Sequence, residues 1–206
     1  ESIMNKAVLK LAQQQLDPLT YKLVDGNYDL IVHEIMKTED KHIKLEIAEI
    51  NGLDENTVDY LILDKDSEVR RRTAAKQALT LDQIDFLVFD ECDKVVMEVA
   101  KLSILQSQQI DYIINERDPN ERILIEVSKN KNLLERHVKE LYYYSISTPE
   151  IKENILNNND KYQTLFNIYK IEDMRKRHIR MPGIEETFMD EEEWGKRKEK
   201  MYRDFS

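Results

Sequence analysis

The sequence predicts an all-α fold, an α-solenoid of about six short helix–turn–helix repeats with a period of about 26 residues. Three observations carry this prediction: a recurring helical triplet of apolar residues, a second series of helix-capping residues between the triplets, and few turn-forming residues. The 206 residues include only four Gly and four Pro, whereas all-β folds use many more of both in their turns. The composition therefore favours short helices.

An apolar residue followed by two more at +3 and +4 recurs along the chain, and this spacing places all three on one helical face. The first members lie 24 to 28 residues apart, with three consecutive steps of 26. Each triplet predicts the buried stripe of the first helix of a repeat. The triplets are Val8/Leu11/Ala12, Val32/Ile35/Met36, Val58/Leu61/Ile62, Ile84/Leu87/Val88, Ile110/Ile113/Ile114, Val138/Leu141/Tyr142 and Leu165/Ile168/Tyr169.

A second series of residues predicts where the second helix of each repeat begins. Its members are Asp17, Asp40, Asp66, Cys92, Asp118 and Thr148. Asp and Thr are favoured N-caps, because their oxygens accept hydrogen bonds from the free N–H groups of the first turn. Pro18, Pro119 and Pro149 each follow such a residue, where the missing N–H costs nothing. Asp118 and Glu121 are further expected to form a capping box.

The second helices carry apolar stripes of their own, and turns are expected near 16–17, 38–40, 64–66, 90–92, 116–118 and 145–148. The stripes are Ile43/Ile47/Ala48, Val69/Thr73/Ala74, Val95/Val99/Ala100 and Ile151/Ile155/Leu156, with Ile123, Ile125 and Val127 in the out-of-register fourth helix. Helices of about ten residues are marginal alone, so stacked pairs must bury a continuous core. We assign residues 1–170 to the repeat array and 171–206 to a charged tail, either a capping helix or a docking segment.

Residues 61–75 resemble a HEAT-like unit of the leucine-rich-repeat-variant type. Such units have an Asp-rich turn followed by Val-Arg and Ala, matched here by Asp64, Asp66, Val69, Arg70 and Ala74. The next unit keeps Asp90, Val95 and Ala100, with Val96 in place of the Arg. The resemblance covers about residues 28–130 and implies architecture only. Relatives with an iron–sulfur cluster need a cluster of cysteines that this chain lacks, so no such cofactor is implied.

Charge and cysteine content narrow the classes of function. The formal net charge is −10, opposite to the basic balance that phosphate contacts require of a dedicated DNA-binding domain. Cys92 is the single cysteine, which is natural in a reducing compartment. We find no apolar run long enough to span a bilayer and no secretory segment at the start. We therefore expect a cytoplasmic protein without a membrane partner; its frequent Ile, Asn and Lys are typical of a low-GC bacterium or its phage.

No set of residues predicts catalysis, a cofactor or a bound metal. The histidines His33, His42, His137 and His178 lack metal-ligand spacing, and no phosphate-binding or nucleophile motif is present. Cys92 is interpreted as a small residue in place of a capping Asp, the alternative being a thiol activated by the helix N-terminus. The sequence thus predicts a protein that is not an enzyme.

Two regions are candidate partner-binding sites. Arg70, Arg71 and Arg72 form the sharpest basic cluster; the resemblance places their helix on the concave face, where they either pair with nearby acids or contact a phosphate or acidic peptide. In the tail, Trp194, Phe188 and Tyr202 are apolar anchors among charged residues.

A third feature recurs on three successive first helices, where Asp59, Asp85 and Asp111 precede Tyr60, Phe86 and Tyr112. We expect the carboxylates to form an inter-repeat hydrogen-bond ladder or a solvated ridge, and the aromatic rings to pack between repeats.

The sequence therefore predicts a non-catalytic scaffold or adaptor that binds a macromolecular partner, most simply a protein, through the groove or the tail. Self-association through the tail is a further option. The alternative is a nucleic-acid-binding HEAT-like module with the architecture of the alkylpurine DNA glycosylases. It is disfavoured because the second helices contain no aromatic residue and no continuous basic stripe.

Overall fold

The regular elements of the chain are helices, as predicted. The computed structural model describes residues 10, 13, 14, 16, 28–37 and 39–206, and no strand occurs among them. The first triplet and the caps expected at Asp17 and Pro18 lie outside the described residues. The chain divides into two compact units, residues 1–99 and 100–206, and each is described by itself.

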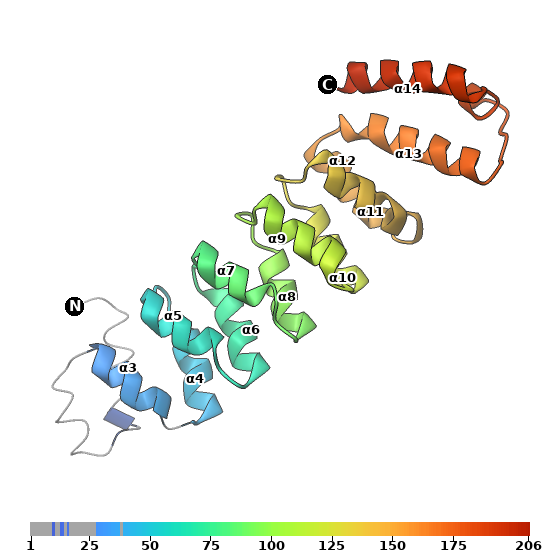
Figure 1. Cartoon of the computed structure of the whole chain (residues 1–206). Coiled ribbons are helices and arrows are strands. Elements are labelled where there is room, and N and C mark those ends of the chain that lie inside the picture. Colours follow the sequence, from blue (N-terminus) through green and yellow to red (C-terminus); the bar gives the residue numbers. More distant parts are fainter. Residues whose placement is uncertain (1–9, 11–12, 15, 17–27, 38) are drawn as a thin grey trace. The chain divides into compact units, whose positions relative to one another are not determined.

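In unit 1, residues 1–99, helices α3 to α7 pack against helices two elements away in the chain. Thus α5 contacts both α3 and α7, and α4 contacts α6, while α5 also contacts α4 and α6 (Figure 1). The helices α3, α5 and α7, which carry the first series of apolar stripes, thus form successive contacts, and α4 and α6 of the second series contact each other. The described helices are α3 (Tyr28–Lys37), α4 (Lys41–Ala48), α5 (Glu55–Ile62), α6 (Ser67–Lys76), α7 (Leu81–Leu87) and α8 (Asp93–Ala100), whose last residue begins unit 2.

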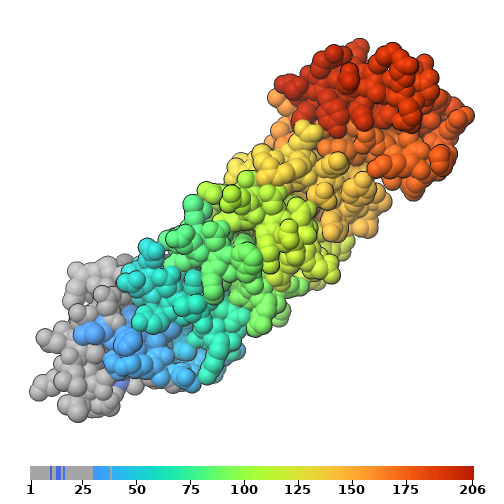
Figure 2. All heavy atoms as spheres, viewed as in Figure 1, coloured from blue at the N-terminus to red at the C-terminus, as the bar shows by residue number. Residues whose placement is uncertain are grey.

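Unit 2 repeats the same packing and ends in a helical hairpin. Here α11 contacts η1 and α13, α10 contacts α12, and α14 lies against α13. Within each unit, side chains fill the spaces between neighbouring ribbons (Figure 2). The helices are α9 (Ser107–Asp111), the π-helix η1 (Tyr112–Glu116), α10 (Glu121–Ser128), α11 (Glu135–Ser147), α12 (Pro149–Asn158), α13 (Tyr162–Lys176), the 3₁₀ turn η2 (Glu185–Thr187) and α14 (Glu191–Phe205). The boundary expected at residue 170 falls inside α13.

The core follows the two apolar stripes closely. Leu61, Leu87 and Ile113, the middle members of three triplets, are each 0% exposed. In unit 1, apolar side chains from α3, α4, α5 and α6 form one cluster that includes Ile35, Ile47 and Leu61. The +3/+4 triplets therefore identified buried residues correctly, because a period of 3.6 residues leaves only one face of each short helix for the core.

Two of the described caps have the expected geometry. The side chains of Asp40 and Asp66 accept hydrogen bonds from the N–H groups of His42 and Glu68, both at 2.8 Å, and α4 and α6 begin directly after them. Pro149 stands at the start of α12 as predicted. Thus α4 and α6 begin where a side-chain oxygen accepts a hydrogen bond from a free backbone N–H, and α12 begins at a proline, which has no such N–H.

The expected cap at Asp118 and its capping box with Glu121 are wrong. The N-cap of α10 is Asn120, whose side chain accepts from the Ile123 N–H at 3.0 Å. The preceding chain contains a π-helical turn, closed by a hydrogen bond from the Arg117 N–H to the Tyr112 carbonyl at 3.2 Å. A π-turn accommodates an extra residue, which delays the start of α10. The core positions accordingly become Ile123, Leu124 and Val127, while Ile125 is half-buried. The expected breaks at 64–66 and 90–92 separate α5 from α6 and α7 from α8, whereas α11 continues to Ser147, so the break near 145–148 is reduced to Thr148. Residues 17 and 38 of the first two expected turns lie outside the described residues.

Two amide side chains link segments that lie 27 to 29 residues apart in the chain. Gln77 donates to the carbonyls of Ala48 and Ile50 at 2.8 and 2.7 Å. In unit 2, Asn130 donates to the Leu102 carbonyl at 3.2 Å. These bonds go to carbonyls at the end of a helix or in the turn that follows it, where helical backbone partners run out.

Candidate interaction surface

The structure places Arg70 inside the fold, where it joins two successive turns. The residue is 8% exposed. Its Nε and Nη2 donate to the Asp90 carboxylate at 2.7 and 3.1 Å, and Nη1 donates to the Asp64 carbonyl at 2.7 Å. Asp90 raises the pKa of the Arg70 guanidinium above its usual value. The donors of Arg70 are thus directed to groups of the fold rather than to a partner.

Arg71 and Arg72 are half-buried and also pair with acids of the same unit. Arg71 forms a two-bond pair with Glu68 at 2.7 and 2.8 Å and reaches Glu98 at 3.3 Å. Arg72 pairs with Glu49 and Glu68, both at 3.2 Å. Hydrogen bonds from Arg71, opposed by burial, lower the pKa of Glu68 to about 2. All three arginines are therefore paired within the fold: Arg71 and Arg72 share Glu68, and Arg70 pairs separately with Asp90.

Trp194 is a buried residue of the C-terminal hairpin. It lies at the start of α14 and is 4% exposed. Arg175 and Lys198 stand over its ring, 5.7 and 5.8 Å from the centroid. Arg175 also donates to the carbonyls of Glu186 and Met189 at 2.8 and 2.6 Å. A partner has no access to this indole while the hairpin is folded.

The other two tail candidates differ in exposure. Phe188 is 52% exposed, just after η2. Tyr202 is half-buried on α14, and burial raises the pKa of its hydroxyl. Phe205, near the end of α14, lies 5.9 Å from the Tyr162 ring of α13. Tyr202 and Phe205 thus help to hold α14 on α13, whereas Phe188 is exposed to solvent.

The recurring aspartates take part in hydrogen bonds between neighbouring first helices. Gln83 of α7 donates to Asp59 of α5 at 2.8 Å in unit 1. In unit 2, Nε2 of His137 on α11 lies 2.7 Å from Asp111 of α9, and Arg136 binds the same carboxylate at 2.8 Å. These two contacts agree with the expected inter-repeat ladder.

The hydrogen bonds around His137 fix its tautomer. Nδ1 accepts from the Leu134 N–H at 2.9 Å, so Nε2 must carry the proton that is donated to Asp111. Gln83 makes the equivalent contact with the Thr80 N–H at 2.9 Å. Burial lowers the pKa of the His137 imidazole below its usual 6.5, although Asp111 opposes this shift. His137 thus makes the same two kinds of hydrogen bond in unit 2 that Gln83 makes in unit 1.

An exposed apolar surface follows the first helices of unit 1. Tyr60 and Phe86 are 48% and 49% exposed, and Leu63 and Phe89 are 65% and 62% exposed. The two pairs are 26 residues apart in the sequence. Tyr60 and Leu63 lie at or just past the C-terminal end of α5, and Phe86 and Phe89 lie at or just past the C-terminal end of α7. With Leu30 of α3, these residues form what we call the acidic aromatic face. About half of the Tyr60 and Phe86 side chains is exposed. Tyr60 also contacts the His33 ring of α3, which agrees with the expectation that these rings pack between neighbouring first helices.

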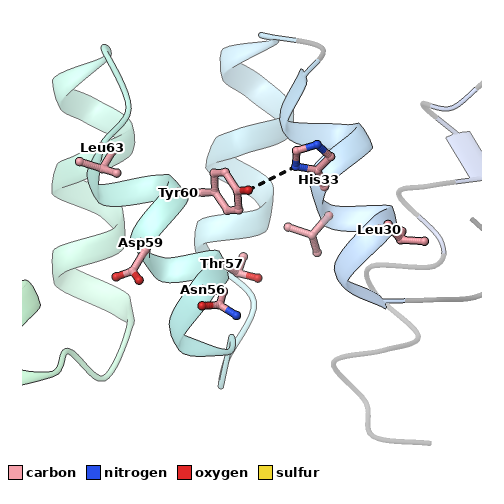
Figure 3. Close-up of a pocket in the computed structure, with 8 residues that line it drawn as sticks. Leu30, His33, Asn56, Thr57, Asp59, Tyr60 and Leu63 are labelled. Atoms are coloured by element: carbon pink, nitrogen blue, oxygen red, sulfur yellow. Dashed lines mark hydrogen bonds between the residues drawn. The ribbon is translucent and has the colours of Figure 1, made fainter.

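Two neighbouring grooves make this face concave. The first, of about 510 Å³, lies between α3 and α5 and is lined by Leu30, His33, Tyr60 and Leu63 together with Val32, Asn56, Thr57 and Asp59. Figure 3 shows Tyr60 directed from α5 toward His33 on α3, and its hydroxyl lies 3.3 Å from the His33 Nδ1. This contact holds the ring upright between the two helices.

The second groove continues the first. It has a volume of about 700 Å³, and its apolar lining includes Ile62, Leu63, Phe86 and Phe89. Leu63 belongs to both grooves. The shared leucine makes one continuous apolar surface across α3, α5 and α7.

Acidic residues surround this surface. Residues 51–64 contain four Asp or Glu and residues 77–93 contain five, and neither stretch has a Lys or Arg. Glu91, which lines the second groove, has a 93% exposed side chain. The exposed cation of that lining, Lys65, is paired with Glu39 at 3.0 Å. The face thus combines exposed aromatic rings with negative charge, which repels phosphate and favours a basic partner.

This surface was visible in the sequence, although its exposure was not. The repetition of an aromatic residue and an apolar residue three positions later, at Tyr60/Leu63 and Phe86/Phe89, falls outside the +3/+4 triplets. Apolar residues that repeat beyond the core stripe are a sign of a second contact surface.

Comparison with known proteins assigns no relationship. No protein family matches the chain, and neither a curated protein nor a solved structure is significantly similar to it. Among the described residues, no three His, Cys, Asp or Glu side chains are grouped to hold a metal ion. No helix in the described part of the chain is long and apolar enough to cross a membrane.

Proposed function

We propose that this chain is a non-catalytic scaffold or adaptor, an α-solenoid of HEAT-like repeats that binds a protein partner through the acidic aromatic face. The observation that carries the proposal is the exposure of Tyr60, Leu63, Phe86 and Phe89 along two connected grooves. Folded monomers rarely leave large contiguous apolar patches in water, and those they do expose are often binding sites.

The repeat architecture supports this proposal. In each unit, helices contact the helices two elements away, and side chains 24 to 29 residues apart are hydrogen-bonded, as with Gln83 and Asp59 or Gln77 and Ala48. Repeats that contact only their neighbours create extended surfaces for a partner. Aromatic residues at such surfaces supply much of the binding energy.

The charge around the face supports a basic protein segment as the partner. The acidic stretches around the grooves favour a protein segment that carries Lys or Arg beside apolar side chains. They oppose the nucleic-acid alternative, because a polyphosphate backbone requires cations. The ion pairs of Arg70, Arg71 and Arg72 give those cations internal partners.

Selection from a random peptide library on the immobilised full chain tests the proposal. We expect the enriched peptides to combine aromatic or aliphatic residues with Lys or Arg. Their affinity should fall tenfold or more for Phe86→Ser/Phe89→Ser, by about 1.4 kcal/mol or more.

Phe188→Ser is the matched control, because Phe188 is as exposed as Phe86 but lies in unit 2. Peptides that bind equally to the Phe86→Ser/Phe89→Ser protein and to the parent would refute the proposal. Loss of binding with Phe188→Ser alone would move the site to the C-terminal tail.

A further inference from the structure

Unit 2 contains an apolar groove whose charge is opposite to that of the acidic aromatic face. It has a volume of about 410 Å³ and lies among α11, α12 and α13. Ile146 and Ile179, two of its lining residues, are 61% and 38% exposed. Like the grooves of unit 1, it therefore combines a recess with exposed apolar side chains.

The charged lining of this groove is mainly cationic. Lys170 is exposed, and the Lys152 ammonium stands 5.4 Å from the Phe166 ring centroid. Arg177 is also exposed and pairs with Asp173, the groove's acidic residue, at 2.6 Å. Three cations against one carboxylate leave the lining positive. We call this site the basic groove.

One chain thus carries two apolar surfaces of opposite sign. We propose that the acidic aromatic face of one copy receives the basic groove of a second copy, in a head-to-tail contact. The inference rests on the proposed function, since it names the partner of the same face. Aromatic side chains of the face, such as Phe86 and Phe89, fill the apolar recess, and the acids around them meet Lys152, Lys170 and Arg177.

A contact between two different surfaces has a definite consequence for assembly. After two copies join, one acidic aromatic face and one basic groove remain unoccupied, so further copies can add. Such heterologous contacts form a ring if the rotation closes and an open filament if it does not. A symmetric dimer, by contrast, uses the same surface on both copies and stops at two.

The test measures the mass of the full chain by sedimentation velocity. The chain has a mass of 24.6 kDa, and species larger than this are expected at about 100 µM, where micromolar contacts are largely occupied. Two variants each remove one surface: Phe86→Ser/Phe89→Ser is the face variant, and Ile146→Ser/Lys170→Glu is the groove variant. All four residues are exposed, and circular dichroism checks that both variants fold.

Each variant alone should be monomeric, with association weakened tenfold or more. An equimolar mixture of the two should form one-to-one dimers and nothing larger, because one copy supplies an intact groove and the other an intact face. Phe188→Ser should associate like the parent chain.

Three results would overturn the assignment: a parent chain that remains monomeric, self-association that survives in either variant, or a mixture that stays monomeric. If peptide selection still yields ligands that depend on Phe86 and Phe89, only the second-copy assignment is lost. If that selection also fails, the proposed function is lost with it.

Discussion

The ion pair between Arg70 and Asp90 is expected to contribute strongly to the stability of unit 1. The side chains are 10% and 4% exposed, and three hydrogen bonds leave the guanidinium. Arg70→Met removes all three and leaves the Asp90 carboxylate buried without its counter-charge. Breaking a buried pair in this way costs about 3–5 kcal/mol. The Cys92 N–H still donates to Asp90 at 2.8 Å, so we expect about 3 kcal/mol, the lower end of that range.

The matched control is Arg72→Met, the same substitution two residues along the same helix. The Arg72 side chain is 31% exposed and its partners Glu49 and Glu68 are 42% and 32% exposed, so its loss should cost only about 0.5 kcal/mol. Asp90→Asn in the Arg70→Met background removes the carboxylate charge that Arg70 neutralised but keeps an acceptor for the Cys92 N–H. This double variant should regain about 1 kcal/mol or more relative to Arg70→Met.

Urea denaturation of the full chain, followed by far-UV circular dichroism, measures these differences. Trp194 is the single tryptophan and lies in unit 2, so its fluorescence reports that unit separately. Equal urea midpoints for Arg70→Met and Arg72→Met would refute the argument that burial determines how much an ion pair contributes to the free energy of unfolding. A double variant no more stable than Arg70→Met would show that the uncompensated carboxylate is not the cause.

Three further predictions concern the caps, the tail and pH. Asn120→Ala should destabilise the protein by about 1 kcal/mol and Asp118→Ala by less than about 0.5 kcal/mol. Urea melts in which Asp118→Ala is the more destabilising variant would show that Asp118 caps α10 after all. Trp194→Ala should cost about 3–5 kcal/mol, as loss of a buried Trp does; an unchanged melt would indicate an exposed indole. The lowered pKa of His137 means that below pH 6.5 the unfolded chain binds the proton first, so stability decreases as pH falls. His137→Gln preserves both hydrogen bonds and should reduce the loss measured between about pH 7.5 and about pH 5.5; an unaltered pH dependence would exclude His137 as its source.

The helical elements and most of the core could be predicted from local patterns. A triplet such as Val58/Leu61/Ile62 needs only the 3.6-residue period to identify a buried face, and a cap such as Asp66 acts on an N–H two residues away. Such signals are contained within one turn of helix. The cap of α10 was misplaced because its position depends on the π-helical turn at Tyr112–Glu116, for which local propensity gives no clear sign.

The roles of the candidate site residues were decided by contacts between residues distant in sequence. From the sequence alone, Arg70 could point into a groove or toward Asp90, twenty residues away. The buried pair forms because the turn that contains Asp90 packs against the helix that contains Arg70. Trp194 could serve as a docking anchor until α14 folds back onto α13 and places the indole beside Arg175. Tyr60 and Phe86 could equally be core residues or surface residues on an amphipathic helix. The sequence by itself therefore determined the helices, their period and their inward faces, because these follow from local backbone geometry. Tertiary structure alone decided which charges are neutralised and which aromatic rings remain in water, because a side chain's partners and exposure are supplied by the neighbouring repeat.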